Sequence, residues 1–164
     1  GVKTVIVGKP NAGKSSLLNK ILNEDRAIVS DYEGTTRDTI EEFVNIGGIP
    51  LKLIDTAGIR KTDDYVEKIG VKKAINLIQD ADLVIAIFDI SKKLDEEDFE
   101  ILNLIENKKC IILLNKCDLR QNNPETMLYI SKTNKTVLKA SMKTGIGLKE
   151  LYRNIEDMFQ SEDM

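Results

Sequence analysis

A glycine-rich segment near the N-terminus has the residue types and spacing that hold phosphate. Gly8, Gly13, Lys14 and Ser15 fit the pattern G-x-x-x-x-G-K-[ST], directly after a strand-like apolar run. Glycine lets backbone N–H groups surround an oxyanion, while a lysine can bridge terminal phosphates and a serine hydroxyl can ligate Mg²⁺. We predict a P-loop with Lys14 as a catalytic residue and Ser15 as a Mg²⁺ ligand. Its nucleotide contacts are expected from Asn11, Ala12, Gly13, Lys14, Ser15 and Ser16.

Two further segments carry the groups that complete a nucleotide and Mg²⁺ site. Asp55-Thr56-Ala57-Gly58 ends an apolar strand pattern, where ligands of α/β sheets bind. Asp55 suits a water-mediated Mg²⁺ contact, and the Gly58 N–H suits a γ-phosphate, which makes Gly58 a second catalytic candidate. Thr35 and Thr36 lie in a polar segment typical of a switch loop that closes over Mg²⁺. Thr36 is the favoured Mg²⁺ ligand, although either threonine could instead cap a turn.

A third segment, Asn115-Lys116-Cys117-Asp118, has the groups that recognise a guanine base. Guanine presents adjacent N1–H and N2–H₂ donors that one carboxylate accepts together, whereas adenine does not, so Asp118 should select guanine. The stem of Lys116 can lie on the ring, and Asn115 is placed to tie loops together. A backbone N–H for guanine O6 is expected after the last strand, with candidates Ser141, Met142 and Lys143.

The elements that must position these residues alternate between strands and helices. Strand patterns cover 5–7, 43–46, 51–54, 83–88, 110–114 and 136–138, and helical patterns cover 14–22, 66–79, 96–106 and 147–159. This alternation predicts an α/β fold with a mostly parallel six-stranded sheet and helices on both faces. Gly47-Gly48 separates two strand patterns without a helix, so one antiparallel strand in a hairpin is expected. Asn122-Asn123-Pro124 is expected to be a loop.

Composition limits the remaining possibilities. The 164 residues suit one domain over 1–164, expected to be excised from a larger protein. The chain has no histidine, which removes His-based triads and His-ligated metals, and its net charge of −3 gives no basic footprint for nucleic acid. Two cysteines favour a reducing, cytoplasmic compartment. The longest apolar run, 83–88, is too short to cross a membrane, so no membrane partner is expected.

The residue that activates the attacking water is not identified by pattern alone. Ras-like switches carry glutamine after Asp-Thr-Ala-Gly, but this chain has Ile59, which cannot orient water. The charged residues of 60–67 and Arg37 all remain candidates. A GTP-dependent switch module with slow turnover is therefore an alternative to an efficient GTPase.

The chain resembles the G domains of the MnmE (TrmE) family of tRNA-modifying GTPases, within the wider group of Era- and Der-like P-loop GTPases. The resemblance rests on 8–19, 34–38, 55–60 and 66–71. Ala12 in the P-loop and the short run before Glu67 favour this family over Der, whose role in ribosome assembly is the alternative. The resemblance implies a P-loop GTPase fold and hydrolysis of GTP to GDP and phosphate, dependent on Mg²⁺ and K⁺.

The resemblance also implies roles for particular residues and partners. Glu67 would orient the nucleophile through a water, and K⁺ would be held by Asn11 together with switch-loop backbone at Ser30 and Tyr32. An ordered switch face would then form a nucleotide- and K⁺-dependent homodimer. Hydrolysis would drive a conformational change in the full-length protein, which would act on the tRNA wobble uridine with a partner like MnmG.

Overall fold

The elements of the chain alternate as predicted, with one addition. The computed structural model describes residues 1–24, 41–56, 58–59, 71–119 and 122–160. The element order is β1 (Val2–Val7), α1 (Lys14–Glu24), β2 (Glu41–Ile46), β3 (Ile49–Ile54), α3 (Val71–Asp80), β4 (Leu83–Asp89), α4 (Glu96–Leu104), β5 (Cys110–Asn115), α5 (Pro124–Ser131), β6 (Thr136–Lys139) and α6 (Leu148–Phe159).

Six strands form one sheet in the order β2-β3-β1-β4-β5-β6. All neighbouring pairs are parallel except β2 with β3, which are antiparallel and joined by the Gly47-Gly48 turn. Both turn glycines have positive φ, at 58° and 89°, and the Gly48 N–H donates to Asn45 Oδ1 at 2.8 Å. The mostly parallel sheet with one antiparallel strand is therefore confirmed.

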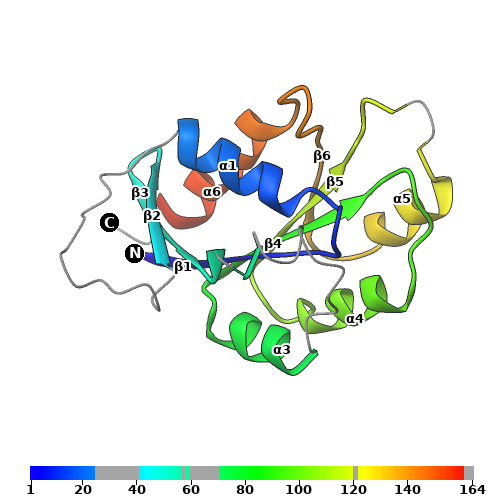
Figure 1. The fold of residues 1–164 in the computed structure, drawn as a ribbon, viewed down its shortest axis with the longest axis horizontal. Coiled ribbons are helices and arrows are strands. Elements are labelled where there is room, and N and C mark those ends of the chain that lie inside the picture. The colour runs from blue at the N-terminus through cyan, green and yellow to red at the C-terminus, as the bar shows by residue number, and fades with distance from the viewer. Residues whose placement is uncertain (25–40, 57, 60–70, 120–121, 161–164) are drawn as a thin grey trace.

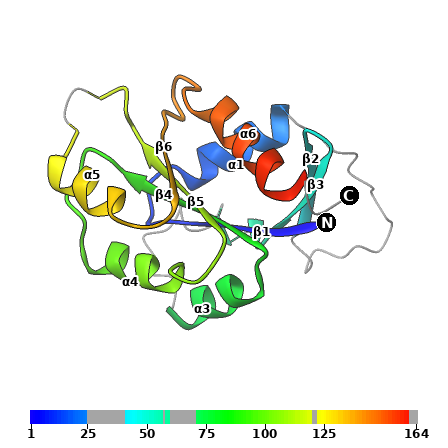
Figure 2. The same cartoon turned by 180° about the vertical axis from the view of Figure 1, so that it is seen from behind.

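Helices cover both faces of the sheet, and each face has its own apolar core (Figures 1 and 2). The helices α1 and α6 pack on one face through residues such as Leu17 and Leu151. On the other face, α3, α4 and α5 pack through Ile78, Leu102 and Ile130. Side chains that alternate along the inner strands supply both cores, because successive residues of a strand point to opposite faces. This double cover explains why β4 and β5 are apolar at nearly every position.

The sequence analysis expected a loop at Asn122-Asn123-Pro124 and no helix after it, and the missing helix is an error. The structure has a helix, α5, which starts at Pro124. Asn123 caps it, accepting a hydrogen bond from the Thr126 N–H at 3.1 Å. Proline suits the first position of a helix because the missing N–H has no intrahelical partner there. The Asn-Asn-Pro segment that suggested a loop thus contains the start signal of a short helix.

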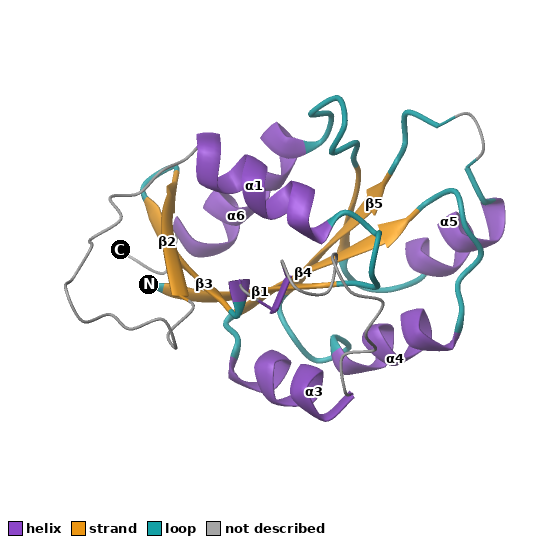
Figure 3. Cartoon of the chain, in the orientation of Figure 1, coloured by secondary structure: helices purple, strands orange, loops and turns teal. Residues whose placement is uncertain are grey.

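The parallel strands bring the candidate residues to one edge of the sheet. In Figure 3 the arrows of β4 and β5 point the same way, so the loops that follow them lie together. The P-loop follows β1, Asp55 follows β3, and Asn115 ends β5. Across the part of the chain that the structure describes, no helix combines the length and apolarity needed to cross a membrane.

Candidate functional site

At two positions of the loop between β1 and α1, the surrounding atoms leave room only for glycine. Gly13 has φ +119°, and a Cβ there would overlap the Asn115 side-chain amide. A Cβ on Gly8 would lie 2.6 Å from the Ile87 carbonyl oxygen. Asn11 also adopts a left-handed conformation, with φ +67°. These features place the loop beside the N-terminus of α1, whose N–H groups favour an anion, as the predicted phosphate cradle requires.

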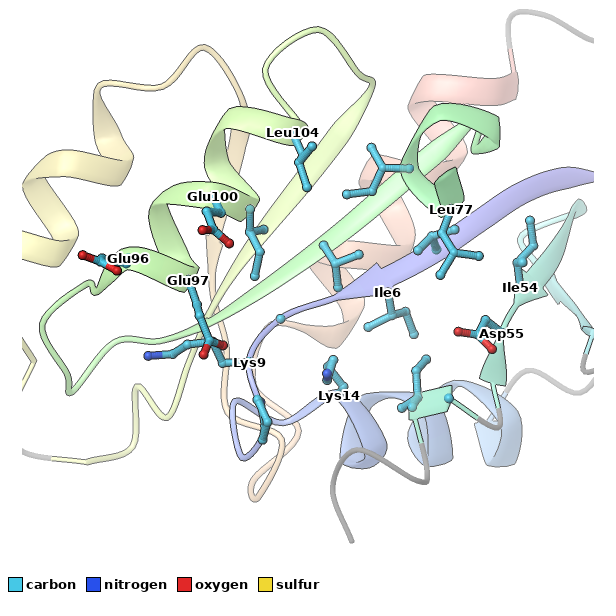
Figure 4. Close-up of a pocket in the computed structure, with 18 residues that line it drawn as sticks. Ile6, Lys9, Lys14, Ile54, Asp55, Leu77, Glu96, Glu97, Glu100 and Leu104 are labelled. Carbon is cyan, nitrogen blue, oxygen red and sulfur yellow. The ribbon is translucent and has the colours of Figure 1, made fainter. Parts of the chain in front are cut away.

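Three of the phosphate and Mg²⁺ candidates, Lys14, Asp55 and Gly58, line a cavity of about 400 Å³ whose other walls include apolar side chains of β1, α3 and α4 (Figure 4). Lys14 begins α1 and is 1% exposed, and Asp55 directly follows β3. Gly58 lies against Asp55, because a Cβ there would overlap the carboxylate. The start of α1 and the segment after β3 thus bring together three residues predicted for the phosphates and Mg²⁺.

The donor set around this cavity suits Mg²⁺. Ser15 and Asp55 offer a hydroxyl and a carboxylate, and Ser15 Oγ donates to the Ile59 carbonyl at 3.4 Å, which places α1 against the segment after β3. Mg²⁺ takes few protein ligands and completes its shell with phosphate oxygens and water. No group of three or more His, Cys, Asp or Glu side chains that could hold a metal occurs among the described residues. The residues present therefore fit a Mg²⁺ ion that is shared with a phosphate ligand.

Asn115 links three loops of the site, as the sequence analysis predicted. Its side-chain amide donates to the Ala12 carbonyl at 2.8 Å, and its Oδ1 accepts the Met142 N–H at 3.0 Å. The residue is 4% exposed. A buried amide that uses both its donor and its acceptor fixes the P-loop, the end of β5 and the loop after β6 relative to one another.

Asp118 and Ser141 form the part of the site predicted to read guanine. Ser141 Oγ donates to Asp118 Oδ1 at 2.8 Å, and Asp118 is exposed beyond the end of β5. Each carboxylate oxygen can accept two hydrogen bonds, so the two bonds expected from guanine N1–H and N2–H₂ are compatible with the bond from Ser141. Of the N–H groups predicted for guanine O6, those of Ser141 and Met142 donate within the protein, to the Ile146 carbonyl and to Asn115, while Lys143 is exposed.

The structure adds an ion pair that the sequence analysis missed. Lys116 Nζ lies 2.8 Å from Asp89 Oδ2, and Ser91 donates to Asp89 Oδ1 through both its N–H, at 2.9 Å, and its hydroxyl. Burial alone would raise the pKa of the Asp89 carboxyl, but the hydrogen bonds from Lys116 and Ser91 outweigh it and lower that pKa. Asp89 ends β4, so the strand-end argument that identified Asp55 could have found it.

A second ion pair connects the P-loop to α4. Lys9 Nζ lies 2.7 Å from Asp95 Oδ2 and 3.1 Å from Asp98 Oδ2. The same two aspartates form a capping box at the start of α4. Burial opposes the charge of Lys9, yet the bonds to Asp95 and Asp98 raise its pKa. The start of the P-loop is therefore held to the N-terminus of α4.

Several predicted site residues lie outside the described residues. They are Ser30, Tyr32, Thr35, Thr36, Arg37 and Glu67. Two others are described and exposed: Asn11, expected at a K⁺ site, and Ser16, expected to contact the nucleotide. The cysteines lie where the sequence suggested, with Cys110 in the core, where burial raises its pKa to about 12, and Cys117 half-buried.

Comparison with known families decides what this arrangement belongs to. The model of the family described as "50S ribosome-binding GTPase" matches residues 3–116, from β1 to the residue after β5. The chain belongs to this GTPase family. It is therefore a GTP-hydrolysing domain, and the predicted GTPase activity is confirmed at this level.

The similarity to tRNA-modifying GTPases is also confirmed. The chain is 57% identical over 158 residues to the tRNA modification GTPase MnmE of Clostridioides difficile, covering 96% of this chain and 34% of that protein. It is 52% identical over 159 residues to that of Finegoldia magna, covering 97% of this chain and 34% of the relative. The chain thus spans about a third of the length of the curated relatives it matches.

Solved structures agree with the fold of this family. The translation elongation factor SelB from Methanococcus maripaludis, in complex with the GTP analogue GPPNHP, matches with a TM-score of 0.69 at 17% identity, covering 97% of this chain and 34% of SelB. The G domain of the T. maritima FeoB iron transporter matches with a TM-score of 0.65 at 27% identity, covering 95% of this chain and 97% of that domain. The predicted P-loop GTPase fold is confirmed.

Proposed function

We propose that this GTPase domain hydrolyses GTP to GDP and phosphate as part of a tRNA-modifying enzyme. The observation that carries the proposal is the identity of 52–57% to the tRNA modification GTPase MnmE over nearly the whole domain. The geometry of the site supports it, because groups suited to phosphate, metal and guanine converge from the ends of β1, β3, β5 and β6.

Different residues of the proposed site bind the phosphates, the guanine base and Mg²⁺. The P-loop N–H groups and Lys14 hold the phosphates, and Asp118 accepts hydrogen bonds from guanine. Ser15 and Asp55, with Thr36 of the switch loop, hold Mg²⁺ in this proposal. When bound, Mg²⁺ neutralises charge on the phosphate oxygens. Lys14 supplies a buried positive charge near the same oxygens, where the low dielectric strengthens its effect.

Positioning of the attacking water is assigned to Glu67, following the resemblance to the MnmE family. Ile59 is 6% exposed and packs in the core, so it has no group to orient water. Asn11, with the backbone at Ser30 and Tyr32, is the proposed K⁺ site. A monovalent cation there would supply positive charge of the kind that an arginine finger supplies in other GTPases.

The test compares hydrolysis in KCl and NaCl for the wild type and Glu67→Ala. We expect K⁺ to stimulate single-turnover hydrolysis of the wild type, and Glu67→Ala to abolish turnover while GDP and GTP affinities change by less than about 5-fold. Comparable rates for wild type and variant in KCl would move the role to Asp63, Asp64 or Arg37. Equal wild-type rates in both salts would favour a slow switch module.

In the full-length protein, GTP hydrolysis is proposed to drive a conformational change that acts in tRNA wobble-uridine modification with an MnmG-like partner. The family to which the chain belongs is described as a 50S ribosome-binding GTPase, which favours one rival, a ribosome-associated GTPase. Co-sedimentation of the full-length protein with ribosomal subunits, together with unchanged wobble uridine in a deletion strain, would support the rival. Loss of the modified uridine in that strain would support the tRNA role.

A further inference from the structure

A carboxylate at the end of β4 faces the loop that reads the base. In the sheet, Asp89 pairs with Asn115 at the last register position of β4 and β5. Lys116 directly follows β5, and its side chain reaches toward β4, so that its Nζ lies 2.8 Å from Asp89 Oδ2. The backbone of Lys116 is left-handed, with φ +70°, which is uncommon for lysine. The chain therefore adopts an unfavourable backbone conformation at the residue that makes this contact.

Asp89 is itself held in place before it meets Lys116. Ser91 donates two hydrogen bonds to Asp89 Oδ1, from its N–H and from its hydroxyl, so the other oxygen, Oδ2, faces the lysine. The Asp89 side chain is 10% exposed and that of Lys116 is 32% exposed. A fixed, nearly buried acceptor thus holds the end of a half-buried lysine.

The pair lies beside the P-loop. Asp89 lines a small hollow of about 90 Å³ together with Asn11 and Ala12 of that loop. The lysine stem between this anchored end and the β5 terminus consists of four methylenes, and Lys116 stands between Asn115 and Asp118 in the sequence. A guanine base that bonds to Asp118 would lie with one face toward such a stem.

We propose that Asp89 is a positioning residue that presets the Lys116 stem as a platform for the guanine ring. The inference rests on the proposed function, in which Lys116 covers the base. Without Asp89, the lysine samples many rotamers and must be ordered when nucleotide binds. With Asp89, that ordering is already complete in the free protein, and preorganisation of this kind raises affinity.

The size of the effect follows from the ordering of one long side chain. Immobilising such a side chain costs enough to change a dissociation constant by about 2- to 10-fold. Asp89→Asn should therefore weaken GDP binding by that factor. Because the platform contacts the ring face and not the C2 amino group, IDP binding should weaken equally, leaving the GDP/IDP ratio unchanged. Hydrolysis at saturating GTP should keep its rate.

A double-mutant cycle with Lys116→Met separates positioning from a structural role. Methionine keeps an apolar stem but has no charge for Asp89 to hold. We expect Asp89→Asn to weaken GDP binding in the wild type and to have no further effect in Lys116→Met, measured by displacement of a fluorescent GDP. An equal loss in both backgrounds would overturn the inference, since Asp89 would then act on the fold.

Two further variants separate the proposed role of Asp89 from general effects on the fold. Asp82→Asn is the matched control, because Asp82 adjoins the opposite end of β4, where its carboxylate accepts the Lys3 N–H at 2.9 Å, and this variant should bind GDP as the wild type does. Ser91→Ala removes the hydroxyl hydrogen bond to Asp89 and is a second test. Its loss of GDP affinity should be smaller than that of Asp89→Asn and should also vanish in Lys116→Met. This variant decides the question if Asp89→Asn does not fold. Unchanged GDP affinity in Asp89→Asn would also overturn the inference. If Lys116→Met alone binds GDP as tightly as the wild type, the proposed role of Lys116 fails instead.

Discussion

At the scale of single residues, the selectivity of the site depends on one carboxylate whose orientation the protein fixes. Ser141 is fully buried and donates to one oxygen of Asp118, and its own Oγ accepts the Thr144 N–H at 3.2 Å. The Asp118 carboxylate is thereby oriented before a base arrives. A wrong base would leave the remaining oxygen unpaired, and unpaired polar groups are what make hydrogen-bonded sites discriminate.

Replacing this carboxylate with an amide should change the preferred base. In Asp118→Asn the amide can donate to the C2 carbonyl of xanthine, which replaces the amino group of guanine. We expect GTP affinity to fall by about 10²-fold or more and XTP to become the preferred nucleotide. A competition assay with GTP and XTP measures this, and a variant that still prefers GTP would show that another residue selects the base.

At the scale of elements, the sequence predicted the positions of candidate residues best where a residue directly follows a strand. Patterns in the P-loop, at Asp55 and at Asn115 and Asp118 were sufficient to predict that these residues gather at one edge, because parallel strands carry their following loops there, while their ligands stay predictions. Asp89 was missed because it was regarded as the polar end of an apolar run, and its partner Lys116 was assigned to the base. The contact between them depends on strand register, which a sequence without pairing information does not give.

The helix α5 was missed for a related reason. Asn-Pro is a loop signal in many chains, and the helix that follows is only eight residues long, too short for a clear apolar period. Its identity as a helix depends on the Asn123 cap and on packing of Ile130 against the second core. Tertiary contacts and a local cap together decided the conformation, and neither is visible from periodicity alone.

A substitution at Asn115 tests whether this residue stabilises the P-loop, the end of β5 and the loop after β6 together. Asn115→Ala removes the buried bonds to the Ala12 carbonyl and the Met142 N–H, leaving both backbone groups unpaired. We expect a loss of about 2 to 4 kcal/mol in unfolding free energy, together with weaker GDP binding. Urea unfolding and nucleotide titration measure both. The control is Asn154→Ala, whose exposed hydrogen bond on α6 should cost less than about 0.5 kcal/mol.

The pair of Asp89 and Lys116 also gives a pH signature of stability. The pKa of Asp89 is lowered in the folded protein, so its contribution is present above the unfolded pKa of about 3.9 and is lost as pH falls through the folded value. The difference in unfolding free energy between wild type and Asp89→Asn should therefore be constant from about pH 8 to 5 and shrink below about pH 4. A difference that changes near neutrality would point to another group.

At the scale of the whole molecule, the fold separates a rigid body from the edge that binds nucleotide. Two apolar cores hold the sheet between α1 and α6 on one face and α3, α4 and α5 on the other. Among the described residues, the candidate groups lie at one edge of the sheet, in the P-loop and the start of α1 and at the ends of β3, β5 and β6, where several residues have a left-handed backbone. A ligand can reorganise such an edge without disturbing either core, which is what a nucleotide-dependent switch requires.

The same edge is where a second copy of the domain would bind in the proposed K⁺-dependent dimer. Asn11 is exposed on the P-loop with a left-handed backbone, so its side chain is available to a monovalent cation at this surface. A cation held by Asn11 and the switch-loop backbone would order that face, and an ordered face can pair with its symmetry mate in an isologous interface.

We expect the domain to be a monomer with GDP and a dimer with GDP, aluminium fluoride, Mg²⁺ and K⁺, because the fluoride mimics the phosphoryl group in transit and completes the charge that orders the switch face. Na⁺ should fail because it is too small for the same ligands. Asn11→Ala should lose both the dimer and K⁺ stimulation while keeping GDP affinity. Asn19→Ala, the same change at an exposed position of α1, is the control expected to keep the dimer. Light scattering decides between the outcomes, since an equal molecular mass in K⁺ and Na⁺ would show that the cation does not control association.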